Sequence, residues 1–341
     1  MTKSWVEQKY FKTAGDFFQA METRETSASY QIDRELAAQI KPADSLFMCG
    51  FWRSGTTWLQ QALAAWLEAK LVFEPLFCLA PDARVVFDAH HVADKKFGYL
   101  LLYMPYYDGD DLRGHPLHDF FDRALRSTLG GEWIRKYRRD LAESYRTRTI
   151  LKCVRSQLCL RAVQNTFGMP VIHIYRDPRA IVASAKMTEW YPMFERLSLR
   201  RQLLQPADGR AAFFSQWRGE IQQYDEQDTP ARLTAYWALT EKFLQHSYAD
   251  GRGRFVSVSY EELCRRREKL LQEVLEKLSV RPAAENALPA LEGDSSSTSA
   301  PRRGASVDDR LTGWKKILSA AEIAAIEAVA QYFGFEERLV S

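Results

Sequence analysis

The strongest constraint on the fold is an apolar strand that runs through a short hydroxyl-rich turn into a helix. Residues 47–59 read Phe-Met-Cys-Gly-Phe-Trp-Arg-Ser-Gly-Thr-Thr-Trp-Leu. Backbone N–H groups and the helix dipole at a helix N-terminus favour an anion, and Ser54, Thr56 and Thr57 add hydroxyl donors. The run therefore predicts a phosphate-binding turn at the end of a strand, although a turn that only caps its helix is also compatible with these residues.

The turn departs from the phosphate loop of ATP-hydrolysing proteins. The spacing from Gly50 to Gly55 fits the start of G-x-x-x-x-G-K-[ST], but Thr56 occupies the position where that motif needs lysine. A phosphate-loop kinase or an ordinary triphosphate hydrolase is therefore disfavoured. The cation of this turn is Arg53, which precedes the glycine and is placed to reach the 5′ end of a nucleotide.

A second strand also ends on a cation. Residues 170–175 form a continuous apolar strand that runs into Arg176, and Pro178 suits the first turn of a following helix. A guanidinium offers permanently charged, bidentate donors to a phosphate. The competing interpretation pairs Arg176 with Asp177 or a surface acid.

The Arg-Ser-Gly-Thr-Thr-Trp motif at 53–58 resembles the 5′-phosphosulfate loop of sulfotransferases, whose donor is 3′-phosphoadenosine 5′-phosphosulfate (PAPS). The resemblance implies that Arg53, Ser54, Gly55, Thr56 and Thr57 hold the 5′ end of PAPS. It also implies that Arg176 and Ser184, which have the family's spacing of eight residues, hold the 3′-phosphate of PAPS and of its product PAP.

The Tyr-Glu-Glu-Leu run at 260–263 resembles the adenine-side turn of the same family. Tyr260 and Trp58 are thus candidates to contact the adenine, which offers a face for stacking. Both are equally compatible with the core, because Trp58, Ala62, Leu63 and Trp66 share one helical face.

The resemblance extends from about residue 45 to residue 339 and implies a P-loop-NTPase-like sulfotransferase fold: α/β, with a central, mostly parallel sheet flanked by helices. We expect a single domain over 1–341, with a core at 45–339, an N-terminal helical extension at 1–44, an acceptor-side insertion at 187–228 and a mobile lid at 282–313. The alternation of strand and helix patterns agrees with this fold class. It predicts strands at 45–49, 149–153, 171–175 and 254–258 and helices at 62–70, 156–167, 178–186 and 267–278.

The choice of general base follows from the branch of the family. Cytosolic members use the histidine of a Lys-Thr-His triplet, but here the triplet is Lys152-Cys153-Val154, and valine cannot take a proton. Residues 71–76 and 173–180 look like the carbohydrate sulfotransferases, and the tyrosylprotein enzymes carry a glutamate 21 residues after the loop arginine. This resemblance implies Glu74 as base, with Arg53 and Lys152 neutralising the leaving oxygen.

Glu74 ends an apolar strand, so we expect partial burial to raise its pKa toward the working pH. The alternative makes Glu74 a structural partner of Arg53 or Lys152. A non-catalytic nucleotide sensor would keep the donor residues and lose Glu74 and Lys152 without consequence.

The family's closing Arg-Lys-Gly motif has a variant here, Arg302-Arg303-Gly304. These residues are predicted to bind the 3′-phosphate as a clamp. In the alternative, they only belong to the polar, serine-rich stretch at 294–300, whose composition suggests a lid.

Composition bears on the partners, the location and the metal content of the protein. The formal net charge of +3 does not imply a nucleic-acid partner, and no apolar run reaches transmembrane length, so a cytoplasmic protein is expected. The five cysteines and six histidines show no metal-ligand spacing, so no metal is expected to be required.

The acceptor is expected to be a hydroxyl of a carbohydrate or glycolipid, in a pocket shaped by the aromatic segments at 97–107 and 189–217. Peptidyl tyrosine, a phenolic natural product and a carrier-bound β-hydroxyacyl chain stay open as acceptors, and so does a homodimeric state.

Overall fold

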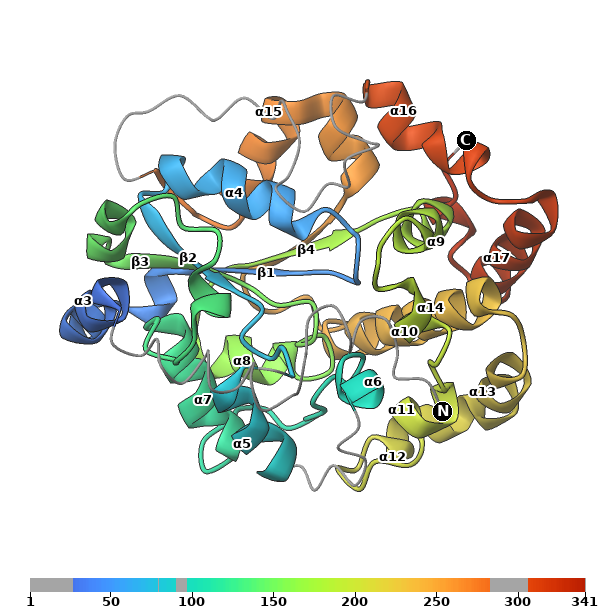
Figure 1. Cartoon of the computed structure of the whole chain (residues 1–341), viewed down its shortest axis with the longest axis horizontal. Helices are drawn as coiled ribbons and strands as arrows, with labels where there is room; N and C mark the ends of the chain where they lie inside the picture. The colour runs from blue at the N-terminus through green and yellow to red at the C-terminus, as the bar shows by residue number, and fades with distance from the viewer. Residues whose placement is uncertain (1–26, 79, 90–96, 283–305, 341) are drawn as a thin grey trace.

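A five-stranded sheet forms the centre of the molecule (Figure 1). The computed structural model describes residues 27–78, 80–89, 97–282 and 306–340. The strands lie in the order β2-β3-β1-β4-β5, and every neighbouring pair is parallel. Their bounds are β1 Leu46–Cys49, β2 Ala69–Phe73, β3 Arg148–Lys152, β4 Val171–Tyr175 and β5 Phe255–Ser259. The predicted α/β fold is confirmed, and all five carboxyl ends lie along one edge of the sheet.

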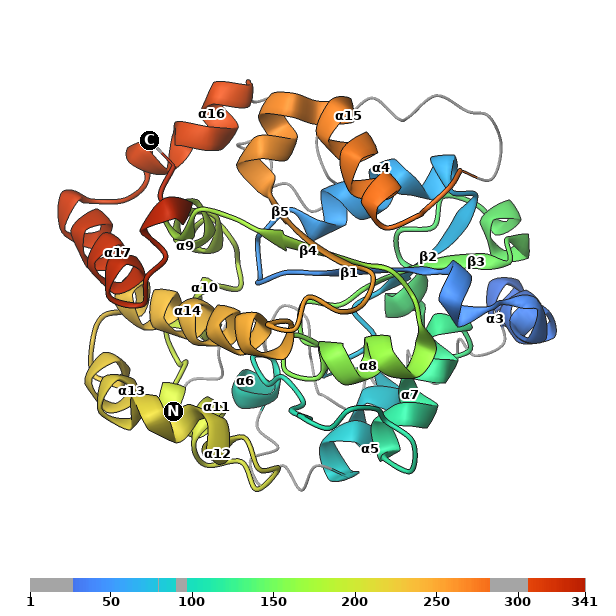
Figure 2. The same ribbon diagram turned by 180° about the vertical axis from the view of Figure 1, so that it is seen from behind.

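Helices cover both faces of the sheet, as the two opposite views show (Figures 1 and 2). Successive side chains of a strand point to opposite faces. In β1, Leu46 and Met48 pack in one apolar layer with α4 (Thr56–Trp66) and α15 (Tyr260–Lys277). Phe47 and Cys49 pack in the other layer with α7 (Pro116–Leu125) and α8 (Leu160–Phe167). The central strand is therefore buried from both sides, as a parallel sheet requires.

A third apolar layer lies beyond the end of β4. It is built from α9 (Pro178–Lys186), α14 (Thr229–Ser247) and α17 (Ala320–Tyr332). The other α-helices are α3 Ala28–Leu36, α5 Pro81–Ala89, α6 Phe97–Leu100, α10 Tyr191–Phe194, α11 Leu199–Leu203, α12 Ala211–Phe214, α13 Arg218–Asp225 and α16 Val307–Thr312. Short 3₁₀ turns cover Ala37–Gln39, Pro42–Asp44, Glu132–Arg135 (η3), Leu141–Tyr145, Ser215–Trp217, Gly313–Lys316 and Glu336–Arg338.

Most predicted elements exist, but their bounds shift. β4 and α9 match the prediction residue for residue. The predicted helix at 62–70 is wrong at both ends: it begins at Thr56, directly after the turn, and Lys70 belongs to β2. The chain reverses at Glu68, which has a left-handed φ of 46° and carries no sequence signal for a turn.

The predicted helix at 267–278 begins at Tyr260 instead, and its backbone is broken by a φ of 45° at Arg267. Ser259 caps this helix by accepting hydrogen bonds from the N–H groups of Glu261 and Glu262, which explains the early start.

Helix α3, from the predicted N-terminal extension, is bound to the edge strand β2 through the buried carboxylate of Asp33. Asp33 is fully buried. Its oxygens lie 2.9 Å from Lys70 Nζ in β2, 2.8 Å from Arg135 Nε and 2.8 Å from Arg138 Nη1. We refer to these four residues as the Asp33 cluster.

Two further features bear on function. None of the helices in the described ranges is long and apolar enough to cross a bilayer. The five cysteines are all buried and unpaired.

Candidate active site

The site begins at the turn between β1 and α4, where two glycines allow a close approach. A Cβ on Gly50 would lie 2.3 Å from the carbonyl oxygen of Ile174, so only glycine lets the chain leave β1 this close to β4. Gly55 has a φ of 93° and is followed at once by the first residue of α4. Arg53 also adopts a left-handed φ, 68°, which is uncommon without glycine. The predicted anion turn is thus a tight, strained strand-to-helix connection.

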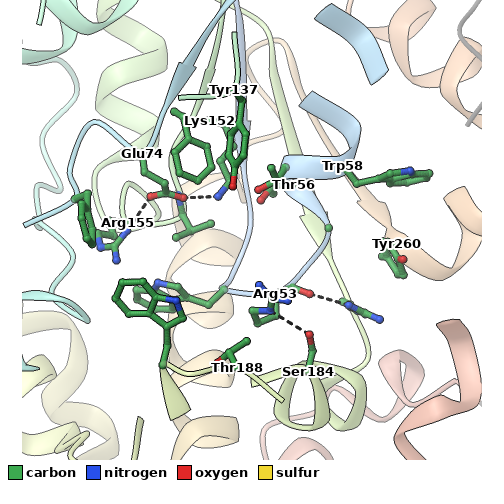
Figure 3. A pocket seen from close by; sticks show the side chains of 18 of the residues that line it. Arg53, Thr56, Trp58, Glu74, Tyr137, Lys152, Arg155, Ser184, Thr188 and Tyr260 are labelled. Carbon is green, nitrogen blue, oxygen red and sulfur yellow. Dashed lines mark hydrogen bonds and ion pairs between the residues drawn. The ribbon is translucent and has the colours of Figure 1, made fainter. Parts of the chain in front are cut away.

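The second predicted anion site starts at the end of β4, beside the first. Asp177 caps α9 by accepting a 2.8 Å hydrogen bond from the N–H of Arg179, with Pro178 in the first turn. Arg53 Nε donates to Ser184 Oγ at 3.0 Å, and Arg176 Nη1 donates to the carbonyl of Arg53 at 2.9 Å (Figure 3). Residues more than 120 positions apart in the sequence therefore meet at one point.

The two aromatic candidates lie together at one end of this site. Trp58 and Tyr260 meet edge to face, with ring centroids 5.7 Å apart, and both are buried. The guanidinium carbon of Arg176 lies 4.2 Å from the Tyr260 ring centroid. A Cβ on Gly55 would come within 2.4 Å of Tyr260 Cδ2, so this ring closes against the turn. Both aromatics pack in the core and also border the site.

One cavity of about 270 Å³ joins the predicted donor residues to Glu74. The residues predicted from the sequence that line it are Arg53, Gly55, Thr56, Thr57, Trp58, Glu74, Lys152, Arg176, Ser184 and Tyr260. In Figure 3, Glu74 lies at one end and Trp58 and Tyr260 at the other, with Arg53 between them.

Glu74 follows β2 directly and has a left-handed φ of 44°. One carboxylate oxygen accepts a hydrogen bond from Lys152 Nζ, and the other accepts one of 2.9 Å from Arg155 Nη1. The N–H of Val154 adds longer hydrogen bonds of 3.2 and 3.4 Å to the two oxygens. The structure therefore joins two of the predicted catalytic residues, Glu74 and Lys152, and adds Arg155.

The expectation of a raised pKa at Glu74 is wrong. Burial raises the pKa, but the charges of Lys152 and Arg155 outweigh it and hold the pKa below its ordinary value of 4.5. Arg155 was missed by sequence reasoning, although it follows β3 three residues after Lys152. Glu74 is thus an ionised, tightly paired carboxylate at the wall of the cavity.

Aromatic rings form the wall of the cavity around Glu74. Phe77 and Trp133 are stacked, with centroids 4.2 Å apart and an interplanar angle of 22°. Both predicted acceptor segments contribute to the lining, through Leu101, Leu102, Trp190 and Phe194. Tyr103, from the first of these segments, is instead fully buried in the core. The segment after α7 was missed, and it supplies Trp133, Lys136 and Tyr137.

The predicted clamp residues Arg302, Arg303 and Gly304 lie outside the described residues. Further along the predicted 282–313 segment, Asp309 and Arg310 of α16 line the cavity. Arg176 Nη2 donates to the carbonyl of Arg310 at 3.3 Å. The C-terminal part of the predicted lid segment thus borders the cavity beside Arg176.

Two predicted phosphate contacts carry unsatisfied donors. Ser54 Oγ and Arg176 Nε are buried and have no hydrogen-bond partner in the part of the chain that the structure describes. Such groups cost roughly 1–3 kcal/mol each unless a ligand or water satisfies them. Arg176 lines the cavity, whereas Ser54, which was predicted to hold the same ligand, is fully buried and does not line it. Within the same ranges, no group of three or more histidine, cysteine, aspartate or glutamate side chains is arranged to hold a metal ion.

Fold and site together define a parallel α/β protein with a ligand cavity at the carboxyl edge of its sheet, the place where such sheets bind ligands. The model of the sulfotransferase family matches residues 45–283, and the chain belongs to this family. The protein is accordingly a transferase. The family match does not separate the carbohydrate and tyrosylprotein branches, so that narrower assignment stays a prediction.

Two solved structures are similar to this chain. One is the sulfotransferase domain from the curacin biosynthetic pathway, with 14% identity, 86% of this chain and 98% of that chain covered, and a TM-score of 0.43. The other is the sulfotransferase domain from the Synechococcus PCC 7002 olefin synthase, with 16% identity, coverage of 85% and 94%, and a TM-score of 0.41. No curated protein matches the chain.

Proposed function

We propose that this protein transfers the sulfuryl group of PAPS to a hydroxyl of an acceptor and releases PAP. The observation that carries the proposal is the single cavity that joins the Arg53, Arg176 and Ser184 contacts to the Glu74 carboxylate. When bound, PAPS supplies a sulfuryl group attached to a phosphate leaving group. Transfer of such a group is accelerated mainly by positioning and by cations that face the developing charge.

The donor end of the cavity suits a ligand with two phosphates. We assign the 5′-phosphosulfate to residues 53–57 and the 3′-phosphate to Arg176 and Ser184, with the adenine toward Trp58 and Tyr260. The unsatisfied Nε donor of Arg176, which lines the cavity, supports this assignment, because it is a polar group that a phosphate oxygen would satisfy. The hydrogen bond from Arg53 Nε to Ser184 Oγ holds these two side chains in place before a ligand binds.

At the other end of the cavity, Glu74 is assigned as the general base. As the acceptor oxygen bonds to sulfur and the bond from sulfur to the bridging oxygen breaks, the hydroxyl proton passes to a Glu74 oxygen. In a loose transition state this proton becomes acidic only late, so a carboxylate of low pKa is a sufficient acceptor. Lys152 and Arg53 are assigned to the negative charge that develops on the bridging oxygen.

We assign the acceptor to the ring-lined wall and favour a carbohydrate or glycolipid. The stacked rings of Phe77 and Trp133, with Trp190 nearby on the lining, offer flat apolar faces of the kind that pack against sugar rings and lipid chains. In this assignment the described ranges act as one catalytic domain, with 187–228 on the acceptor side.

The donor assignment is tested with PAP and AMP, which differ by the 3′-phosphate. PAP is expected to raise the melting temperature well above the effect of AMP, and Arg176→Ala is expected to remove the difference. Arg252→Ala is the matched control, because Arg252 lies on the surface away from the cavity. Equal shifts for PAP and AMP in the unmodified protein would contradict a 3′-phosphate site. A transfer screen with labelled PAPS over sugars, glycolipids, phenols and peptides then tests the acceptor.

A further inference from the structure

The acceptor side of the cavity carries a lysine that the proposed reaction does not use. Lys136 follows η3 and lines the cavity. Its ammonium nitrogen lies 3.9 Å from the Trp133 ring centroid, 4.8 Å from that of Tyr137 and 5.0 Å from that of Phe73. Tyr137 is seen beside Glu74 and Lys152 in Figure 3. The ammonium is therefore held by ring faces at the end of the cavity where the acceptor is assigned.

Within the described residues, the charged side chains around the cavity leave this lysine without an ion-pair partner. Lys152 and Arg155 bind Glu74, and Asp309, the other acidic residue of the lining, binds Lys316 at 2.8 Å. The arginines of the lining other than Arg155 are Arg53, Arg176 and Arg310. The Arg176 guanidinium donates hydrogen bonds to the backbone carbonyls of Arg53 and Arg310, so the three lie together at the donor end. Among the described residues, no carboxylate forms an ion pair with Lys136.

The surroundings of Lys136 make its charge costly. Although the residue as a whole is exposed, its ammonium is covered by three rings. This burial and the charge of nearby Lys152 lower the pKa of Lys136 to about 8, and the opposing attraction of Glu74 is too weak to restore it. An anion placed against the ammonium would offset both effects, and their attraction would be stronger in this ring-lined region than in open water.

We propose that Lys136 is a specificity-determining residue that pairs with an anionic group of the acceptor, beside an apolar or ring-shaped body that packs on Trp133 and Phe77. This inference rests on the proposed function, because it takes the ring-lined end of the cavity as the acceptor end. It narrows the acceptor class to molecules that carry both a hydroxyl and a negative charge.

The test uses two probes with the same ring system, 8-anilino-1-naphthalenesulfonate and N-phenyl-1-naphthylamine, of which only the first carries an anionic group. Binding of both probes to the full chain is measured by fluorescence, with and without saturating PAP. In the series with PAP, the ligand occupies Arg53 and Arg176, so that these cations cannot bind the anionic probe. The unmodified protein is expected to bind the anionic probe about tenfold more tightly, which corresponds to about 1.4 kcal/mol. Lys136→Gln is expected to remove this preference, and Lys136→Arg to retain it.

Lys277→Gln is the matched control, because it removes the same charge from an exposed position at the end of α15. A preference that survives in Lys136→Gln, or an unmodified protein that binds both probes equally, would overturn the inference. The melting-temperature shift with PAP is measured on the same samples. If PAP gives no melting-temperature shift while the probe preference depends on Lys136, the donor assignment fails and the anion site stands. If PAP gives a shift while the probe preference does not depend on Lys136, only the anion site is rejected.

Discussion

Two buried carboxylates, Glu74 and Asp33, are built alike and differ in one respect. Each holds cations from distant parts of the chain: Lys152 and Arg155 bind Glu74, and Lys70, Arg135 and Arg138 bind Asp33. In both, burial raises the pKa and the surrounding cations lower it by more. Glu74 lines the cavity, however, and Asp33 does not. A buried charge cluster is therefore a sign of chemistry only where a ligand can reach it.

The two clusters are joined through one short segment. Arg135 and Arg138 bind Asp33, while Trp133, Lys136 and Tyr137 of the same segment line the cavity. The Asp33 cluster thus ties down the backbone of the segment that carries Trp133 and Tyr137 into the ring-lined wall of the cavity. Glu74 is thus assigned to the reaction, and Asp33 is assigned to the support of the cavity wall. Substitutions of the two carboxylates can test whether their roles differ in this way.

The largest effect is expected from Glu74→Gln. The amide fills the same space but cannot take the proton, so the rate of transfer from labelled PAPS should fall by about 10²–10⁴-fold. The PAP-induced rise in melting temperature should persist, because the donor contacts are at the other end of the cavity. Turnover close to that of the unmodified protein would move the base elsewhere and make Glu74 the structural partner of Lys152.

A loss of stability is expected from Asp33→Ala. The substitution leaves Lys70, Arg135 and Arg138 buried without a counter-charge, which should lower the free energy of unfolding by about 3–5 kcal/mol. Urea denaturation followed by circular dichroism measures it. Asp111→Ala is the control, because its partner Arg113 is 81% exposed, and no measurable change is expected there. Equal midpoints for the two variants would contradict the structural role of Asp33.

Acid is expected to affect the same cluster. Because the folded state lowers the pKa of Asp33 below its ordinary value of 3.8, its stabilising contribution is complete above that pH and is lost as the pH falls toward the folded-state pKa. The denaturation midpoint should therefore hold as the pH falls to about 3.8 and drop below that pH, and it should drop less in Asp33→Asn. The lowered pKa of Glu74 likewise predicts no loss of kcat/KM from this group between pH 5 and pH 8.

The smallest effect is expected from Lys70→Met. Burial lowers the pKa of Lys70, so its charge is held at a cost, and Arg135 and Arg138 still neutralise Asp33 when it is removed. The main loss is the 2.8 Å hydrogen bond from Lys70 to the carbonyl of Ser144, worth about 1 kcal/mol. A loss as large as that of Asp33→Ala, measured by the same denaturation, would show that Lys70 and not the arginines balances the carboxylate.

Short sequence patterns predicted those features of the fold and the site that depend on neighbouring residues. The apolar run into Pro178 predicted β4 and α9 to the residue, and the glycine-bounded turn and the Arg176–Ser184 spacing predicted residues that the fold brings to one cavity. The helix predicted at 62–70 failed because the reversal at Glu68 has no residue that favours a turn.

Long-range effects could not be predicted in this way. The position of Glu74 was expected from spacing, but its pKa depends on Arg155, which reaches it across 81 positions of sequence. Asp33 and Lys136 carry no motif at all: one gains its role by meeting three cations, and the other by lying among three rings.

The position of α3 has a practical consequence for defining the smallest folding unit of this protein. The match to the family begins at residue 45, whereas Asp33 lies before that point and supplies the carboxylate that neutralises Lys70, Arg135 and Arg138. A fragment cut at the family boundary would leave these three cations close together without their carboxylate, and their repulsion would weaken the packing of the segment that carries Trp133 and Tyr137. The autonomous unit must therefore start no later than α3, ahead of the part that sequence similarity marks out.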